Sequence, residues 1–434
     1  MGVSPTYRKR RAARWIPAIV VFALAAGGCS SSTASSPSST TSSTNTSANA
    51  ITAFYQPPQP LPAAPAGTLI RSTRVTGVQG VPSDATVWRI LFHSTTIYGA
   101  DAAESGYVIA PGSSPPAAGY PVIAWAHGTT GFAAPCAPSL FTNAGGGSGP
   151  YLLPGLASYL RAGFVVAAAD YQGLGVADGV HPYLLGASEG RAVLDATRAS
   201  RQLSGLRTAN TVVIYGHSQG GHAALFAGEM APTYAPDLHV VGVVAAAPAT
   251  GLSTLISIIG TPAGQQFLSF SIPASYSWTQ TYNDLPVTDV FTPTGEQFAS
   301  TEVTKGCLAS VANAISGQHL TPSQVFPASS ETNPVVIAHA QANDPGQVRT
   351  TVPMLVLQGT KDTTVPPSLT DGFVTSKACP VGDTVQYLHV TGATHGTVVF
   401  MGAPSILRWM EGRLSGSPAP TTCGQPGDSA TLNG

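Results

Sequence analysis

The sequence has 434 residues, of which 43% are hydrophobic and 9% charged, and its formal net charge is −1. A chain of this length can bury a large core, as one large domain or as several smaller ones. The first 14 residues hold five basic residues and no acidic one, and the other 14 basic and 20 acidic residues give a net charge of −6. This mildly acidic remainder argues against nucleic-acid binding, which normally needs a basic face.

The first 29 residues are typical of an export signal. The basic stretch precedes an apolar run from Ile16 to Ala26, which has the length of a signal-peptide core and is too short for a permanent transmembrane helix. The run ends in Ala25-Ala26-Gly27-Gly28-Cys29, which resembles a bacterial lipoprotein signal with Cys29 as the lipidated residue. Such signals usually have Leu, Val or Ile in place of Ala26, so simple secretion stays the alternative. We expect an exported protein, either anchored to the envelope membrane through Cys29 or secreted.

A low-complexity segment follows this signal. Residues 30–50 are almost all Ser, Thr, Ala, Asn or Pro, a composition with almost nothing to bury. The Pro-rich continuation from Pro57 to Pro65 is expected to be extended. The sequence therefore predicts a disordered linker over residues 30–66, a folded domain over residues 67–423 that begins near Thr68, and a tail over residues 424–434.

Within the folded domain, short apolar runs alternate with segments of helical pattern. Several runs lack polar alternation, which is typical of strands covered on both faces by helices. The predicted strands are Val87 to Phe92, Tyr107 to Ala110, Val122 to Ala126, Val165 to Ala169, Val212 to Tyr215, Val240 to Ala247, Met354 to Gln358 and Val385 to Val390. The predicted helices are Leu156 to Ala162, Ser188 to Leu203, Gln219 to Met230 and Pro404 to Leu414. This order predicts an α/β fold with a mostly parallel, doubly wound sheet.

The alternation stops between Ala249 and Thr350, where the chain is rich in Ser, Thr, Pro and isolated aromatic residues. An insertion between two core strands, at the edge where ligands bind, is most simply a cap over the site. The sequence predicts such a cap over residues of about 250–350. A small independent domain with an unrelated role is the alternative.

The strongest local motif is Gly216-His217-Ser218-Gln219-Gly220. It lies directly after a predicted strand and directly before an Ala-rich helix, which is the context of a nucleophile elbow. The glycines permit the tight turn that lifts the serine hydroxyl clear of the sheet. We therefore expect Ser218 to be a nucleophile, and a serine nucleophile needs a histidine base and an acid that orients the histidine.

Both partners have candidates downstream. Asp362 follows the predicted strand Met354 to Gln358, and His395 follows the strand Val385 to Val390. The chain order Ser, Asp, His is that of the α/β-hydrolase fold. We expect Asp362 to orient His395, and His395 to act as the base.

Other residues compete for these two roles. His389 lies inside a predicted strand, and His217 and His222 flank Ser218 on backbone that should direct them away from it. The alternative acids are Asp344, Asp371 and Asp383, each of which has a Gly or Pro neighbour typical of a surface turn. We expect these residues to be structural.

A second motif, Ala126-His127-Gly128-Thr129-Thr130-Gly131, follows the strand Val122 to Ala126. In this fold the corresponding loop supplies one backbone N–H to an oxyanion hole, and the residue after the nucleophile, here Gln219, supplies the other. We prefer Thr130 as the loop donor, with Thr129 as the alternative. We expect His127 to brace the loop, and Asp170 to cap a turn near the site.

No phosphate-binding loop and no cluster of metal-ligand spacing occurs in the sequence, so we expect no metal and no cofactor. Besides Cys29 the chain has four cysteines, Cys136, Cys307, Cys379 and Cys423. An even number in an exported chain indicates two disulfides, for which three connectivities are possible. We favour Cys379 with Cys423, the closest usable pair, and hence Cys136 with Cys307.

Together the spaced motifs resemble those of the secretory lipases, whose best-known members are fungal lipase A enzymes. The resemblance spans residues of about 57–423 and rests on His127-Gly128-Thr129-Thr130-Gly131, Cys136-Ala137-Pro138-Ser139, Asp170-Tyr171-Gln172-Gly173-Leu174-Gly175, Gly216-His217-Ser218-Gln219-Gly220, Gly359-Thr360-Lys361-Asp362 and Thr394-His395-Gly396. It implies an α/β-hydrolase with a large helical cap and two disulfides in the pairing favoured above. The fungal enzymes carry an acidic residue where this chain has Thr130.

The resemblance also implies hydrolysis of triacylglycerols or other esters. We expect a serine ester hydrolase that acts on lipid or ester substrates and binds no nucleic acid, and the sequence leaves its oligomeric state open. One alternative is an acyltransferase of the cell envelope, which would use the same three residues to transfer an acyl group to an alcohol. The other is a catalytically silent lipid-binding lipoprotein on the same scaffold.

Overall fold

The computed structural model describes residues 52–142 and 150–433. The predicted signal peptide, its Cys29 and the linker up to residue 51 lie outside the described residues. Within the described ranges, no helix combines the length and the apolar character that a membrane crossing requires.

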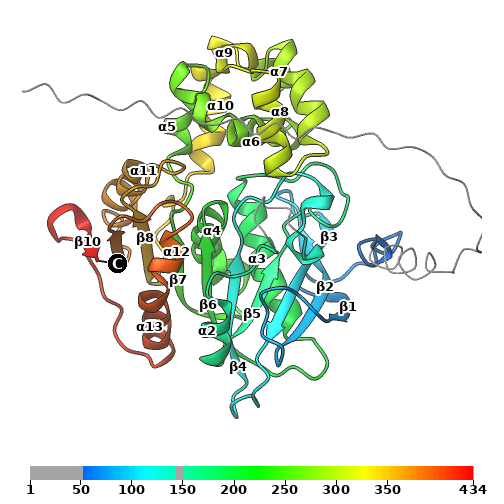
Figure 1. Ribbon diagram of the computed structural model, residues 1–434, viewed down its shortest axis with the longest axis vertical. Helices are drawn as coiled ribbons and strands as arrows, with labels where there is room; N and C mark the ends of the chain where they lie inside the picture. Colours follow the sequence, from blue (N-terminus) through cyan, green and yellow to red (C-terminus); the bar gives the residue numbers. More distant parts are fainter. Residues whose placement is uncertain (1–51, 143–149, 434) are drawn as a thin grey trace, which may run out of the picture. The chain divides into compact units, whose positions relative to one another are not determined.

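Ten strands of the described chain form one sheet in the order β1-β2-β3-β5-β4-β6-β7-β8-β9-β10 (Figure 1). The strands are β1 Leu69–Val75, β2 Thr86–Thr95, β3 Asp101–Ala110, β4 Tyr120–Ala126, β5 Val165–Ala169, β6 Thr208–His217, β7 His239–Ala246, β8 Met354–Gly359, β9 Val385–Val390 and β10 Ala430–Leu432. The first three strands and the pairing of β3 with β5 are antiparallel. All remaining pairings are parallel, as the sequence predicts.

Helices cover both faces of the sheet because side chains of a strand alternate between its faces. In β4, Val122 and Ala124 pack into a core with α3 (Gly186–Ser200) and α4 (Gln219–Tyr234). The intervening Ile123 and Trp125 pack into a second core on the opposite face, formed with α2 (Leu156–Arg161), α12 (Val398–Met401) and α13 (Ala403–Leu414). Both faces of β4 are therefore buried, which explains why its sequence shows no polar alternation.

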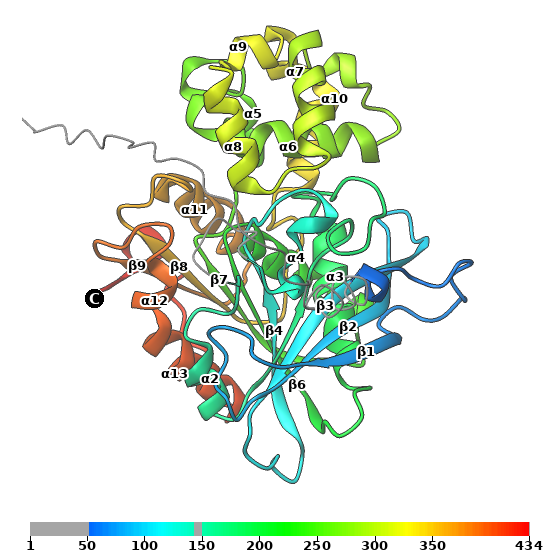
Figure 2. The same ribbon diagram turned by 45° about the vertical axis from the view of Figure 1, so that its right-hand side comes forward.

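A helical insertion, residues 248–353, lies between β7 and β8. Its helices are α5 Leu252–Ile256, α6 Leu268–Thr281, α7 Pro293–Phe298, α8 Leu308–Gly317, α9 Pro322–Val325 and α10 Pro334–Ala342. They share a hydrophobic core that includes Trp278, Phe291 and Phe326 and that also contains Phe132 and Tyr183 from outside the insertion. Figure 2 shows these yellow-green helices gathered at one end of the sheet.

The structure departs from the expected domain limits at both ends. Residues 52–66 were expected to belong to the disordered linker, but Phe54 and Tyr55 are buried against Leu91 and Val176. The expected C-terminal tail contains β10, which pairs with β9 in parallel. Both segments are short and have weak local patterns, and they are ordered by contacts with residues far away in sequence.

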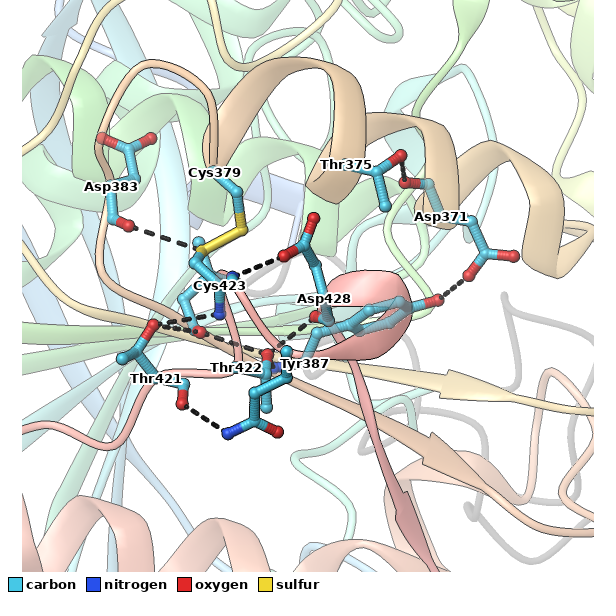
Figure 3. Close-up of a disulfide and its surroundings, with 12 residues drawn as sticks. Asp371, Thr375, Cys379, Asp383, Tyr387, Thr421, Thr422, Cys423 and Asp428 are labelled. Carbon is cyan, nitrogen blue, oxygen red and sulfur yellow. Dashed lines mark hydrogen bonds between the residues drawn. A yellow bond between two sulfur atoms is a disulfide. The ribbon is translucent and has the colours of Figure 1, made fainter.

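Two disulfides join the expected pairs, Cys136 with Cys307 and Cys379 with Cys423. The first links the segment after β4 to the helical insertion. The second joins the segment after α11 (Pro367–Phe373) to the chain that leads into β10, where Thr422 also bonds the backbone of Tyr387 (Figure 3). The C-terminal segment is therefore held to the sheet by a covalent link and by hydrogen bonds.

Candidate active site

Ser218 occupies the turn between β6 and α4, with φ of 59° and ψ of −121°. A residue other than glycine seldom adopts a positive φ, and such strain often marks a functional position. Close packing around the turn excludes larger residues, since a Cβ added to Gly216 would overlap the carbonyl of Gly220, and one added to Gly220 would overlap that of Ala126. The local geometry is that of the predicted elbow.

Asp362 and His395 come together at the same edge of the sheet. Asp362 follows β8 and His395 follows β9, and His395 Nδ1 lies 2.8 Å from Asp362 Oδ2. The other carboxylate oxygen, Oδ1, accepts hydrogen bonds from the backbone N–H groups of Thr364 and Val365, each at 2.9 Å. Burial alone would raise the pKa of Asp362, but the hydrogen bond and charge of His395, with these two amides, outweigh it and lower that pKa. Asp362 is thereby kept ionised beside His395.

Ser218 lines the same cavity as Thr364 and Val365, which bond Asp362, and its hydroxyl forms no hydrogen bond with any residue that the structure describes. The ring of the preceding residue, His217, lies 4.7 Å from the ring of His395, centroid to centroid. In enzymes without substrate, catalytic hydrogen bonds are often long or poorly aligned. The turn that carries Ser218 therefore lies against the loop of His395, and His395 and Asp362 are in direct contact.

The predicted oxyanion residues follow two neighbouring strands, Thr130 after β4 and Gln219 after β6. β4 and β6 are neighbours in the sheet, and Ala126 pairs with Gly216. Thr130 is buried, and its carbonyl accepts the N–H of Leu308 in the insertion at 3.0 Å. Among the described residues, no acceptor occupies the N–H of Thr130 or of Gln219. The alternative donor, Thr129, contacts Tyr183 through its hydroxyl at 2.8 Å.

The competing histidines have other partners. His127 is buried and lies 2.7 Å from the carbonyl of Gly128 and 3.3 Å from that of Asp170, and burial lowers the pKa of His127 to about 4. His222 contacts Glu189, and His389 contacts Asp371 at 2.8 Å. Among the described residues, the ring of none of the three bonds Ser218 or Asp362, although the backbone N–H of His222 donates to the carbonyl of Ser218 at 3.1 Å.

The competing acids also lie in structural contacts. Asp344 accepts the N–H of Leu252 at the start of α5, and Asp383 accepts the N–H of Thr350. Asp170 is buried with the hydroxyl of Ser105 and the N–H of Ser139 as hydrogen-bond donors. Burial raises the pKa of Asp170 to about 6, although these donors oppose the shift. Asp170 therefore links the segment after β5 to Ser105 in β3 and to Ser139 in the segment after β4.

A buried polar cluster around Glu189 lies behind the elbow and was missed by the sequence reasoning. The Glu189 carboxylate accepts hydrogen bonds from Gln219 Nε2 at 2.7 Å and from the N–H of Leu184 at 2.9 Å. Its second oxygen lies 3.1 Å from His222 Nδ1, and His222 Nε2 lies 2.8 Å from the carbonyl of Asn343 in the insertion. The cluster thus connects the residue after Ser218 to the insertion. In the sequence, the only sign of this cluster is Glu189 itself, an acidic residue in the first turn of a predicted helix.

An apolar cavity opens beside Ser218. Most of its wall comes from the helical insertion, and the rest comes mainly from the segments after β5 and β8. The lining includes Tyr183, Leu184, Leu255, Ile256, Ile259, Phe267, Phe270, Trp278, Val365 and Leu369. Over the described ranges, no group of three or more His, Cys, Asp or Glu residues is arranged to hold a metal ion. The site thus combines the hydroxyl of Ser218, the His395–Asp362 pair and two backbone N–H groups that lack an acceptor among the described residues. These groups lie at an apolar cavity.

Comparison with known proteins identifies the family. The model of the secretory lipase family matches residues 153–422. Lipase A of Arthroderma benhamiae is 26% identical over 396 residues, which cover 85% of this chain and 80% of that protein. A probable inactive lipase of Mycobacterium tuberculosis is 26% identical over 379 residues, or 84% of this chain and 82% of that protein.

Solved structures share the fold. The closed state of Candida antarctica lipase A has a TM-score of 0.71 at 20% identity, over 86% of this chain and 88% of that one. The rice cell wall degrading esterase LipA of Xanthomonas oryzae has a TM-score of 0.65 at 21% identity, over 82% of this chain and 100% of that one. The sheet, the helices on its two faces and the family match together show an α/β-hydrolase. The chain belongs to the secretory lipase family, whose members are exported lipase-type hydrolases.

Proposed function

We propose that this protein is a serine ester hydrolase, a lipase or esterase that acts on triacylglycerol-type esters. Ser218 is the nucleophile, His395 the general base and Asp362 the acid that orients the base. The observation that carries the proposal is the 2.8 Å contact between His395 and Asp362 beside the strained Ser218, at an apolar cavity. No cofactor takes part in this chemistry.

In the first half of the reaction, Ser218 Oγ attacks the ester carbonyl while His395 Nε2 takes its proton. His395 Nδ1 donates to Asp362, which fixes the tautomer that leaves Nε2 free and stabilises the imidazolium that forms. His395 then gives the proton to the leaving alcohol, and an acyl-enzyme remains. In the second half, His395 activates a water molecule that releases the acid.

The negative oxygen of each tetrahedral intermediate is bound by the N–H groups of Gln219 and Thr130, or of Thr129 in place of Thr130. A donor of this kind contributes about 3 kcal/mol to lowering the barrier. The proposal is supported by the adjacency of β4 and β6 and by the burial of Thr130.

The helical insertion serves as a cap that binds the acyl chain. Its aliphatic and aromatic side chains line the cavity from Ser218 outwards, which suits a hydrocarbon chain better than a polar one.

We also propose that Cys29 carries a lipid anchor, which would keep the enzyme at the envelope membrane. Without that modification the protein is secreted.

The test is hydrolysis of p-nitrophenyl esters from acetate to palmitate by purified protein, with Ser218→Ala as the matched variant. We expect turnover by the wild type and a loss of about 10⁵-fold or more in Ser218→Ala, with an unchanged circular dichroism spectrum. Full turnover by the folded variant would exclude Ser218 as the nucleophile.

Two further measurements distinguish the hydrolase from a silent binding protein and from an acyltransferase. One relative is named a probable inactive lipase, so a folded wild type without turnover on any ester would point to a catalytically silent binding protein. Adding glycerol or another alcohol as an acyl acceptor tests for transfer, and an excess of new ester over free acid would indicate an acyltransferase. The chain-length profile of the hydrolase then distinguishes an esterase from a lipase.

A further inference from the structure

His217 is the last residue of β6 and directly precedes Ser218. The sequence reasoning set it aside as a residue directed away from the site. In the structure its side chain is buried and lies against His395, with its Nε2 2.9 Å from the backbone carbonyl oxygen of His395. On the other side, its Nδ1 lies 3.0 Å from the hydroxyl of Tyr151. His217 therefore connects the strand of the nucleophile to the loop of the base.

The partners of His217 define its proton pattern. A carbonyl oxygen can only accept, so His217 Nε2 carries the hydrogen, and Nδ1 then accepts from the Tyr151 hydroxyl. Burial and, secondly, the nearby His395 lower the pKa of His217 to about 3. His217 thus stays neutral around pH 7, and it places no positive charge beside His395 when His395 takes a proton.

The loop that carries His395 is bonded just before that residue, where the N–H of Lys361 donates to the carbonyl of Ala393 and the N–H of Thr394 to the hydroxyl of Thr397, each at 2.8 Å, but at His395 itself the supports are fewer. Its neighbours Thr394, Gly396 and Thr397 are exposed. Among the described residues, His217 is the only donor to the carbonyl of His395, and Asp362 is the only hydrogen-bond partner of the His395 ring. At His395 itself, two bonds therefore help to fix the imidazole, one to the backbone carbonyl and one to the ring.

We propose that His217 is a positioning residue that fixes the backbone of His395, so that the His395 ring reaches Asp362 and Ser218 at the same time. This inference rests on the proposed function, since it takes His395 as the base. A shift of about 1 Å in a reacting group can cost about 100-fold in rate, so the effect of losing the bond should appear in kcat.

The experiment compares two amide variants of the same residue. In His217→Gln the side-chain amide reaches the position of Nε2 and can donate to the His395 carbonyl, whereas in His217→Asn it reaches only the position of Nδ1. We expect His217→Asn to lower kcat about 10- to 100-fold with KM within about twofold of the wild type. We expect His217→Gln to restore kcat to within about fivefold of the wild type.

His389→Gln is the control for the loss of a half-buried histidine from the sheet, because His389 bonds Asp371 and Tyr387 and has no contact with His395. It should keep the wild-type kcat. All variants are assayed at least 15 °C below their melting temperatures, so that a purely structural role would not change kcat.

Tyr151→Phe is a second and milder test if His217→Asn does not fold. It removes the donor to Nδ1 and frees the His217 ring to change tautomer, so kcat should fall at constant KM. The inference is overturned if folded His217→Asn or, in its place, Tyr151→Phe keeps the wild-type kcat, or if His217→Gln is impaired as much as His217→Asn. Absence of Ser218-dependent turnover in the wild type would instead overturn the proposed function, and this inference with it.

Discussion

The two disulfides should differ in what their removal does to activity. Cys136 and Cys307 are 171 residues apart and Cys379 and Cys423 are 44 apart. If a disulfide acts by restricting the unfolded chain, loops of these lengths correspond to about 5 and about 4 kcal/mol of stability at 25 °C. Replacing either pair with alanines should therefore lower the free energy of unfolding by a similar, large amount.

The surroundings of the two bridges are different. On either side of the first bridge, the N–H of Phe132 donates to the carbonyl of Gly306 at 3.1 Å, and the N–H of Leu308 donates to that of Thr130 at 3.0 Å. The Cys136–Cys307 disulfide thus holds the segment after β4, which includes the proposed oxyanion loop, and the helical insertion together. The Cys379–Cys423 disulfide lies close to β9, near the end of the sheet formed by the last strands of the chain (Figure 3).

We expect Cys136→Ala/Cys307→Ala to lower kcat at least 10-fold under conditions where the variant is folded, because a misplaced oxyanion donor loses most of its contribution. Cys379→Ala/Cys423→Ala should keep kcat within about threefold of the wild type. Urea unfolding and p-nitrophenyl ester kinetics at the same temperature give both quantities. Equal kcat values for the two folded variants would refute the coupling of the first disulfide to the oxyanion loop.

Three further predictions concern stability. Burial and, next, Asp195 hold the pKa of Glu104 well above its usual 4.5, so the unfolded chain loses this proton first as pH rises, and stability falls by up to about 1.4 kcal/mol per pH unit above that value. The unfolding free energy of Glu104→Gln, measured in urea, should therefore exceed that of the wild type at pH 8 and not at pH 4. Tyr55→Phe should cost about 1–2 kcal/mol, because it removes a buried hydrogen bond of 2.7 Å to Ser139. Glu189→Gln should cost about 1–3 kcal/mol, because it weakens the acceptor of several buried donors.

Each of these has an outcome that would contradict it. A stability difference between Glu104→Gln and the wild type that does not change between pH 4 and pH 8 would show that Glu104 has the same pKa in both states. An unchanged urea midpoint for Tyr55→Phe would mean that the hydrogen bond between Tyr55 and Ser139 contributes nothing to stability. For Glu189→Gln, the matched exposed variant Glu411→Gln controls for the loss of one negative charge, and equal effects would argue against a special role of the cluster.

The sequence predicted the parts of this protein that local patterns encode. Short apolar runs predicted the eight central strands, and several of these runs lack polar alternation because strands with two buried faces need apolar residues throughout. Asp362 and His395 could be assigned from position alone, since the carboxyl ends of neighbouring parallel strands meet at one edge of the sheet. In the structure these two side chains are in contact, with His395 Nδ1 2.8 Å from Asp362 Oδ2.

Tertiary packing decided the rest. The strand β10 has three residues, and the buried pair Phe54 and Tyr55 follows a low-complexity segment, so neither carries a pattern that separates it from a loop. His217 lies 178 residues from the carbonyl it bonds, and the Glu189 cluster joins residues up to 159 positions apart, from Leu184 to Asn343. The periodicity of a sequence reports which face of an element is buried, but the partner that each polar group finds across the fold depends on how the elements pack.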